Sequence, residues 1–321
     1  MLVYIIRRLL LALLTLVLVS LIVFVSIRFI PGDLIDQMVK EHVFASVIEK
    51  DKTVEAIKHK LGLDVPIYVQ YIRWIGGIIL HGNLGVSLWK GTPVMDEILS
   101  RLPVSLELTF LAIVIAILEA IPLGVYSAAR QDTVGDYIAR SIAISFIAIP
   151  MFWLGVLVTV LPSVWWGWTP PLLYVPFFES PMKNLAQLII PALILGLVLS
   201  GISMRMTRTM MLEVLRQDYI RTAWSKGLRE WVVIGRHALK NALIPVITII
   251  GVQVPYLFAG AVVIEQIFNL PGIGRLTLES ISNRDYTIIS GVNLLVASIV
   301  LVVNLAVDLI YAYLDPRVHY K

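Results

Sequence analysis

The sequence contains no cysteine and few charged residues. None of its 321 residues is a cysteine, so a disulfide framework and a thiolate metal site are both excluded. Asp, Glu, Lys and Arg together make up 15% of the chain, whereas hydrophobic residues make up 58%. A soluble domain of this length has no interior large enough for that much apolar surface. The lipid bilayer is therefore predicted to be the main solvent of the chain.

The common sequence motifs of catalysis are also missing. The chain has no G-x-x-x-x-G-K-[ST] loop for nucleotide phosphates, no H-E-x-x-H zinc motif and no G-x-S-x-G nucleophile motif. The five histidines show no helical pairing, and the net charge of +4 is spread through loops. The sequence therefore predicts a non-catalytic chain with no cofactor or metal of its own and no nucleic-acid partner.

Six apolar stretches are each long enough to cross a bilayer. Five of them carry no charge over 19 or more residues, namely 9–27, 142–164, 185–204, 244–264 and 288–307. The remaining stretch, 103–128, includes Glu107 and Glu119. Continuous runs without period-2 alternation argue against a β-barrel. The predicted fold is an all-α integral membrane protein with six spans, at approximately 1–30, 103–128, 137–164, 184–204, 244–267 and 288–313.

The basic residues of the short loops predict the topology. They cluster before the first span, after the second, between the fourth and fifth, and at the tail, which places all four segments and both termini in the cytoplasm. Residues 31–102 then form an extracytoplasmic loop or subdomain, with a helix over 53–61 that ends at Gly62. The predicted organisation is a first span over 1–30, this outer segment, and a core over 103–321.

An aromatic loop follows the third span on the predicted outer side. It holds Trp165, Trp166, Trp168, Tyr174, Phe177 and Phe178. Such residues are typical of the aromatic belt at the membrane interface. The alternative is a stacking surface for sugar rings or aromatic peptide side chains.

Polar residues inside the spans are expected to face the bundle or a wet cavity, because charge exposed to lipid costs roughly 2.5–3.5 kcal/mol. Gln253 and Asn293 lie deepest and are the candidates for a translocation path. Glu107, Glu119, Asn304 and Asp308 lie in the spans as well. Helix-to-helix pairing, for example of Glu119 with Arg130, is the alternative role for the charged ones.

The cytoplasmic loop over 204–243 has a helix–turn–helix pattern. One apolar face of the second helix is predicted to comprise Leu228, Trp231, Val232, Gly235, Ala238, Leu239 and Ala242. Arg229, Arg236 and Lys240 form a basic stripe on another face. Gly227 is placed where the first helix ends, and Pro245 is predicted to start the fifth span. The loop is either a rigid knob presented to a cytosolic partner or a hairpin on anionic lipid.

Several runs resemble one family of transporter subunits. The run YIRTAWSKG at 219–227, continuing to RHALKNALIP at 236–245, resembles the coupling-loop signature of the membrane subunits of ABC importers. The runs YIIRRL at 4–9, RLPVSLEL at 101–108, EQIFNLPGIG at 265–274 and LDPR at 314–317 resemble the dipeptide, oligopeptide and nickel branch of that family. The likeness extends over nearly the whole chain in order.

This resemblance implies several partners. They are a second permease subunit, which need not be identical, two cytoplasmic ATPases that use ATP and Mg²⁺, and an extracytoplasmic solute-binding protein. The coupling loop of such importers docks in a cleft of the ATPase, which would place Arg221, Thr222, Ala223 and Gly227 at that contact, with Arg229, Arg236 and Lys240 beside them. The generic signature begins Glu-Ala-Ala where this chain has Arg221, Thr222 and Ala223, so an acidic contact at 221 is not expected.

The resemblance also predicts location and cargo. The chain is expected to span the cell membrane several times and to form half of a path for di- or oligopeptides. Oligosaccharides are the second candidate solute, because the Trp-rich loop suits sugar rings, and nickel is the third. A channel or a non-transporting scaffold is the remaining alternative.

Overall fold

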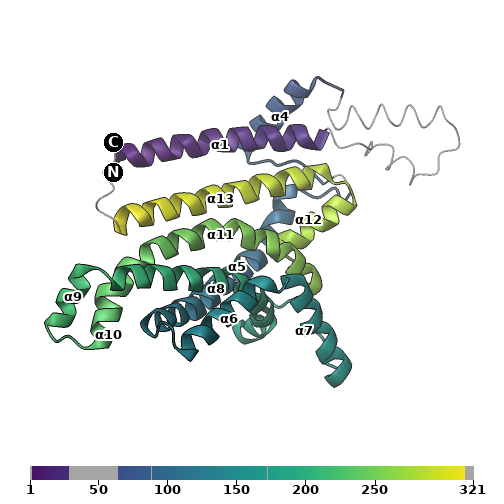
Figure 1. Cartoon of the computed structure of the whole chain (residues 1–321). Helices are drawn as coiled ribbons and strands as arrows, with labels where there is room; N and C mark the ends of the chain where they lie inside the picture. Colours follow the sequence, from purple (N-terminus) through teal and green to yellow (C-terminus); the bar gives the residue numbers. More distant parts are fainter. Residues whose placement is uncertain (1, 29–63, 88, 172, 315–321) are drawn as a thin grey trace. The chain divides into compact units, whose positions relative to one another are not determined.

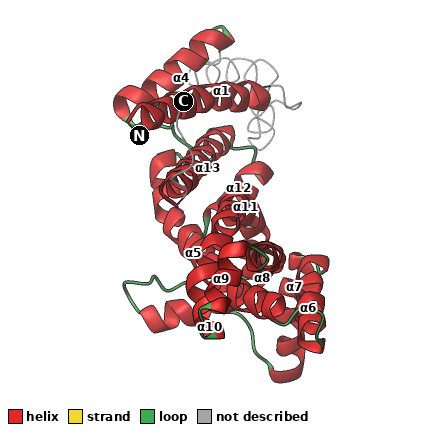
Figure 2. Cartoon of the chain, turned by 60° about the vertical axis from the view of Figure 1, so that its left-hand side comes forward, coloured by secondary structure: helices red, strands yellow, loops and turns green. Residues whose placement is uncertain are grey.

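The computed structural model describes residues 2–28, 64–87, 89–171 and 173–314 (Figure 1). Within these ranges the regular secondary structure is helical (Figure 2). The described residues contain no β-strand, only an isolated antiparallel bridge between Val86 and Pro93. The helix predicted over 53–61 lies outside the described residues. The described helices are α1 Leu2–Arg28, α4 Ile67–His81, α5 Val94–Ala129, α6 Val134–Ala148, α7 Met151–Trp166, α8 Pro181–Leu215, α9 Asp218–Ser225, α10 Glu230–Val232, η1 Val233–Leu239, α11 Lys240–Ile267, α12 Ile273–Ser282 and α13 Tyr286–Leu314.

The chain divides into two compact units. The first unit comprises Met1–Tyr4, Arg101–Leu276 and Ile299–Lys321, and the second comprises Ile5–Ser100 and Thr277–Ser298. The first unit contains most of the core and the whole segment predicted as a cytoplasmic loop, so the site described below lies within it.

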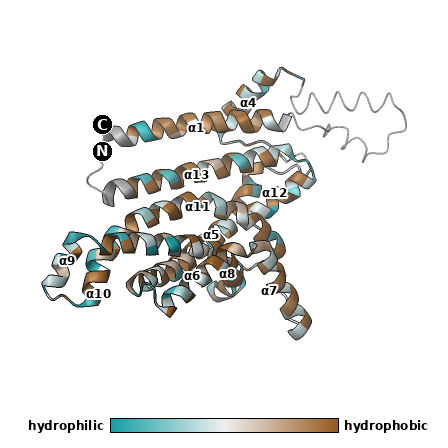
Figure 3. Cartoon of the chain, in the orientation of Figure 1, coloured by the Kyte–Doolittle hydropathy of each residue, from teal (hydrophilic) through white to brown (hydrophobic). Residues whose placement is uncertain are grey.

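The membrane-spanning character predicted from the apolar runs is confirmed. Five described helices are long and apolar enough to cross a bilayer, and a sixth span results if the bent pair α6 and α7 is one crossing. Figure 3 shows that hydrophobic residues predominate along α1, α11 and α13. The fold is thus an all-α integral membrane protein, whereas six crossings and cytoplasmic termini remain predictions.

The predicted third span is not a single straight helix. Helices α6 and α7 meet at an angle of 90° across Ile149 and Pro150. A residue before proline is pushed into the extended region, and Ile149 has ψ 122° accordingly. Pro150 then precedes the first turn of α7, where its missing N–H leaves no helical hydrogen bond unmade. Proline at this position therefore turns the chain.

Two helices extend well beyond the predicted spans. Helix α5 begins at Val94, nine residues before the predicted start at 103, with Asp96 and Glu97 favourably placed in its first turn. Helix α8 runs to Leu215, eleven residues past the predicted end at 204. Apolar burial carries α8 onward, because Thr207 and Met211 are both fully buried. Because charged residues such as Arg205 and Arg208 lie between the buried residues in the sequence, hydrophobicity alone does not predict this extension of α8.

Helices α5 and α8 pack closely and in parallel. A Cβ on Gly196 would lie 2.7 Å from the carbonyl oxygen of Ala112, and one on Gly124 would lie 2.6 Å from Cβ of Thr207. Contacts that advance together along both helices indicate a parallel pair. Such small-residue contacts are the usual means of close helix association in lipid. They bring the C-terminal ends of α5 and α8 together next to the segment that follows α8.

A buried carboxylate fixes the C-terminal end of α11 in the first unit. Ser105 Oγ donates to Glu265 Oε1 at 2.5 Å, and the backbone N–H of Arg275 donates to Glu265 Oε2 at 3.0 Å. Glycine is required opposite this carboxylate, since a Cβ on Gly272 would strike it. Through Glu265, the run EQIFNLPGIG thus connects α11 to α5 and to the start of α12.

Candidate functional site

The segment predicted as a cytoplasmic loop forms a hairpin that projects beyond the ends of α8 and α11 (Figure 1). Its first limb is α9, and its second begins with α10. Gly227 lies between them with φ +71°, a left-handed conformation that glycine adopts without strain. The N–H of Gly227 donates to the carbonyl of Trp224 at 2.9 Å, which closes the last turn of α9. The glycine turn follows the sequence prediction, whereas the helical pattern predicted before it is divided between α8, which ends at Leu215, and α9, which begins at Asp218.

The second limb is not a separate α-helix that ends before the fifth span. It passes through a π-helical segment, η1, and continues without a break into α11. Pro245 therefore lies inside α11 and does not start it. An interior proline costs about 3 kcal/mol. Ala242 and Val246, on either side of the proline, are 1% and 0% exposed, so packing against neighbouring helices holds this part of α11 in place.

The buried side of the hairpin differs from the predicted apolar face. Trp231 is 72% exposed, and Leu228 and Gly235 are exposed as well. Ala238 and Ala242 of the predicted face are buried as expected, and Val233, five residues before Ala238 and outside the predicted face, is fully buried as well. The reason is the π-helix, in which hydrogen bonds join residues five apart and the α-helical period no longer applies.

The hairpin rests on a core of its own. Its buried members are Ala128, Met211, Ile220, Ala223, Val233, Ala238 and Ala242. These residues come from the ends of α5 and α8 and from both limbs. A hydrogen bond of 2.8 Å from Asn241 Nδ2 to Tyr219 Oη also joins the limbs. The hairpin is therefore attached to the ends of the membrane helices as a packed unit.

The residues predicted for partner contact separate into two groups. Ala223 is only 6% exposed and packs inward, so it belongs to the hairpin's own core. The others lie on the exposed surface of the hairpin, and these are Arg221, Thr222, Gly227, Arg229, Arg236 and Lys240.

Large apolar side chains share that exposed surface. Tyr219, Trp224, Leu228 and Trp231 are exposed by 45%, 43%, 36% and 72%. We call these four residues, together with the exposed basic residues Arg221, Arg229, Arg236 and Lys240, the hairpin surface. The sequence prediction missed Tyr219 and Trp224 and assigned Trp231 to the buried side. Aromatic side chains beside arginine are typical of the energetically dominant part of a protein interface.

The charged contacts of this region are mostly exposed. Arg221 pairs with Asp218 at 3.3 Å within α9, and Arg130 pairs with Glu230 at 3.7 Å. The sequence suggested Glu119 as the partner of Arg130, but the partner in the structure is Glu230. Glu119 Oε2 is buried without a hydrogen-bond partner within the described part of the chain. The two exposed ion pairs, Arg221–Asp218 and Arg130–Glu230, each contribute about 0–1 kcal/mol to stability.

The two translocation-path candidates lie on separate units. Gln253 is partly buried on α11 in the first unit. Asn293 is exposed on α13 in the second unit. An exposed amide within an apolar span needs a polar partner or water, because lipid offers no hydrogen bonds. Their part in a translocation path stays a prediction. In the described residues, no group of three acidic or histidine side chains lies close enough to hold a metal ion.

A small polar network ties the aromatic loop after α7 to α5 and α8 within the first unit. Tyr174 Oη donates to Glu107 Oε2 at 2.9 Å, and Asn184 Nδ2 donates to the same oxygen at 3.1 Å. Burial, together with the Glu107 carboxylate, raises the pKa of Tyr174 well above its usual value. Tyr174 is therefore a neutral donor at physiological pH.

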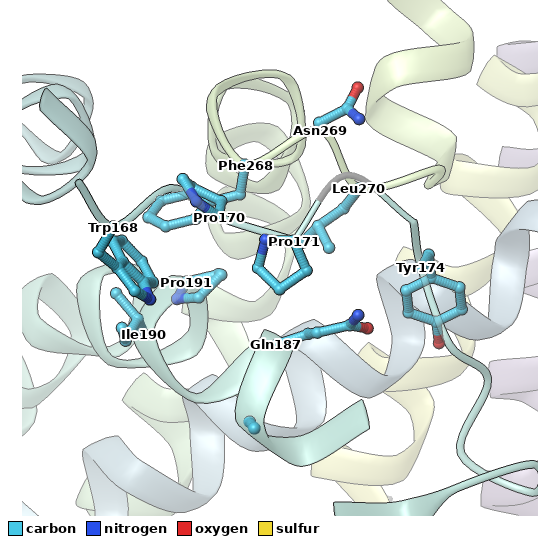
Figure 4. A pocket seen from close by; sticks show the side chains of 11 residues that line it. Trp168, Pro170, Pro171, Tyr174, Gln187, Ile190, Pro191, Phe268, Asn269 and Leu270 are labelled. Carbon is cyan, nitrogen blue, oxygen red and sulfur yellow. The ribbon is translucent and has the colours of Figure 1, made fainter. Parts of the chain in front are cut away.

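A pocket lies beside this network (Figure 4). Trp168, Pro171, Gln187 and Phe268 are among the residues that line it, and its free volume is about 10 Å³. That is room for about one water molecule. A sugar ring or an aromatic side chain does not fit inside, so any stacking would involve exposed aromatic side chains such as Trp165, Trp166 and Phe178.

Known proteins resemble this chain over its full length. Residues 120–320 match the family described as "Binding-protein-dependent transport system inner membrane component", and residues 1–109 match its N-terminal counterpart. A putative peptide transport system permease protein of Brucella suis biovar 1 is 41% identical over 316 residues, which is 98% of each chain. The dipeptide transport system permease protein DppB of Escherichia coli K12 is 37% identical over 344 residues, covering 100% of each chain.

Solved structures show a similar fold. One is the MetNI methionine ABC transporter in an inward-facing conformation, with a TM-score of 0.55, 17% identity, and coverage of 69% of this chain and 97% of that chain. An amino acid ABC transporter crystallised with histidines gives a TM-score of 0.50 at 15% identity, with 70% and 95% covered.

Proposed function

Because this chain belongs to the family of binding-protein-dependent transport system inner membrane components, we propose that it is the permease subunit of a peptide importer driven by ATP. The chain itself catalyses no reaction and spans the cell membrane several times. It supplies half of a translocation path. Di- and oligopeptides are the proposed solute, in keeping with the printed names of relatives that match 98–100% of its length.

The observation that carries the proposal is the exposed hairpin surface. Burial of the hairpin's opposite side fixes its position on α5, α8 and α11, so the hairpin is rigid. The side that remains exposed combines Trp224 and Trp231 with Arg221 and Arg229, which suits a protein partner more than open water. We propose that this partner is a cytoplasmic ATPase subunit.

The proposed complex has five chains. A second, related permease subunit completes the path, two ATPases bind ATP and Mg²⁺, and an extracytoplasmic protein delivers the peptide. In this proposal the chain itself binds neither nucleotide nor metal. ATP-driven approach of the two ATPases would move the hairpins, and the membrane helices would then change their access from one side to the other.

Reconstitution tests the proposal. The chain is co-expressed with a candidate second permease, candidate ATPases and a candidate binding protein from the same genome, purified through a tag on this chain, and placed in vesicles. We expect all subunits to co-purify and a labelled dipeptide to accumulate only with ATP and the binding protein. Purification of the chain as a stable homo-oligomer without ATPases would contradict the proposal and support a channel or scaffold. Accumulation of an oligosaccharide or of Ni²⁺ instead of the peptide would contradict the proposed solute.

A further inference from the structure

A buried ion pair lies in the first unit next to the hairpin core. Arg208 on α8 faces Asp136 in the first turn of α6, with Arg208 Nε 2.9 Å from Asp136 Oδ1 and Arg208 Nη2 2.8 Å from Asp136 Oδ2. The two parallel hydrogen bonds use the planar fork of the guanidinium. Asp136 is 0% exposed and the side chain of Arg208 is 17% exposed.

Asp136 also connects α6 to α5. Ser127 Oγ on α5 donates to Asp136 Oδ1, and the backbone N–H of Asp132 donates to Asp136 Oδ2 at 3.0 Å. Four donors thus surround one carboxylate and satisfy it fully. Thr133 caps α6 by accepting the N–H of Asp136 through its hydroxyl. The ion pair therefore joins three helices at one point.

This point adjoins the hairpin core along two helices. On α5, Ser127 binds the ion pair and the next residue, Ala128, packs in the hairpin core. On α8, Arg208 belongs to the pair and Met211, one turn later, is fully buried in the same core. A displacement of the hairpin therefore acts on the pair across a single helical turn.

Small residues then hold α6 tightly to α8. Ala139 and Ala143 share a buried cluster with Ala120 of α5 and Met204 of α8. A Cβ on Gly201 would lie 2.6 Å from the carbonyl oxygen of Ala143, so the two backbones are in close contact. Close packing resists gradual deformation, and α6 is expected to follow α8 as a rigid element.

We propose that the Asp136–Arg208 pair couples movement of the hairpin to movement of α6, and hence of α7 beyond its bend. The inference rests on the proposed function and assigns positioning roles to both residues. A buried pair is weak support for stability as such, because apolar residues of similar volume often replace one without loss. Its two directional hydrogen bonds, in contrast, fix the register of α6 against α8, which apolar side chains do not.

The test uses the reconstituted importer with the double substitution Asp136→Leu and Arg208→Met. Replacing both charges leaves no unpaired buried ion, so we expect normal assembly. Uptake of the labelled dipeptide should fall about tenfold or more while ATP hydrolysis stays within about twofold, a ratio within the range of coupling free energies. Arg205→Met, an exposed substitution three residues earlier on α8, is the matched control and should leave both rates unchanged.

The outcomes separate cleanly. Dipeptide uptake by the double variant at the wild-type rate per ATP would overturn the inference. If the double variant does not assemble, Arg208→Lys decides, because lysine keeps the charge and loses the fork. A raised ratio of ATP hydrolysis to uptake in Arg208→Lys then supports the inference, and an unchanged ratio overturns it. Absence of uptake in the wild type would instead count against the proposed function.

Discussion

Gly196 lies against the backbone of Ala112, so close that a Cβ on the glycine would be 2.7 Å from the carbonyl oxygen. Contacts between Cβ and backbone oxygen do not occur at that distance in relaxed structures, so a larger residue here would require one of the two backbones to shift. The α5–α8 pair, on which the hairpin rests, therefore depends on the absence of a single methyl group.

Gly196→Ala should destabilise the protein by about 1–3 kcal/mol through overpacking. The measurement is the midpoint of thermal unfolding in detergent. Gly76→Ala is the matched control, since Gly76 is also helical and a Cβ there meets nothing within 4 Å. Alanine has the higher helix propensity, so the control should be neutral or stabilising. Equal midpoints for both variants would contradict the close packing.

Glu265→Gln should also destabilise the fold, by about 1–3 kcal/mol, because one carboxylate oxygen that accepts a hydrogen bond becomes an amide donor in a buried site. The affected donors are Ser105 Oγ and the N–H of Arg275. Thermal unfolding in detergent again gives the measure. Gln266→Ala, at the exposed neighbouring position, serves as the control and should change the midpoint little. An unshifted midpoint in Glu265→Gln would show that the carboxylate is dispensable.

The positions of most spans could be predicted from the sequence, because a run of about 20 apolar residues has few alternatives in a membrane protein. The limits of the spans could not. Arg205 and Arg208 lie within α8 because α5 and α6 bury one side of that helix, and this tertiary fact has no local sequence signal. The partners of Glu265 are likewise out of reach, since Ser105 lies 160 residues away along the chain.

In the hairpin, too, the sequence predicts local features but not those that depend on tertiary structure. The glycine turn is a local property, and Gly227 marked it correctly. The buried face depends on the helical period, and the π-helical segment from Val233 to Leu239 changes that period without changing composition. The sequence consequently pointed to Trp231 as buried, although it is the most exposed of the four large apolar residues of the hairpin surface.

Trp231→Ala should weaken binding of the ATPase subunits without affecting the stability of this chain. An aromatic anchor at an interface contributes about 2–4 kcal/mol, so we expect roughly a 30-fold or greater rise in Kd. The measurement is binding of purified ATPases to the permease pair. Trp166→Ala is a matched control, because Trp166 is equally exposed at 72% and lies on the predicted outer side. Unchanged ATPase binding, with lost binding to anionic vesicles, would favour a hairpin that rests on lipid.

Gly227→Ala should strain the turn, because alanine in the left-handed region costs about 1–2 kcal/mol. Gly227→Asn should cost less, since asparagine adopts that conformation more readily. No steric contact contributes, as a Cβ at this position meets nothing within 4 Å. Limited trypsin digestion reports the effect through cleavage at Lys226 and Arg229, which should be faster in the alanine variant. Equal digestion rates in both variants would contradict a backbone origin.

Tyr174 should resist ionisation at high pH. Its folded-state pKa lies above the ordinary value of 10.0, so the unfolded chain loses this proton first as pH rises. The stabilisation is therefore complete below about pH 10 and is lost progressively above it. Ultraviolet difference absorbance counts the tyrosines that ionise near pH 10. Wild type and Tyr174→Phe should show the same number, whereas one fewer in the variant would mean that Tyr174 titrates normally.

The right-angle bend at Ile149 and Pro150 limits how this part of the chain meets lipid. The 15 residues of α6 and 16 of α7 extend about 22 and 24 Å, each short of the roughly 30 Å hydrocarbon layer. Tilted equally at 45°, the two limbs together would reach just across it. The last carbonyl groups of α6 then lie near mid-depth without helical donors, and hydrocarbon supplies none. A water molecule or another polar group must therefore reach the bend at Ile149 and Pro150 to donate hydrogen bonds to these carbonyl groups.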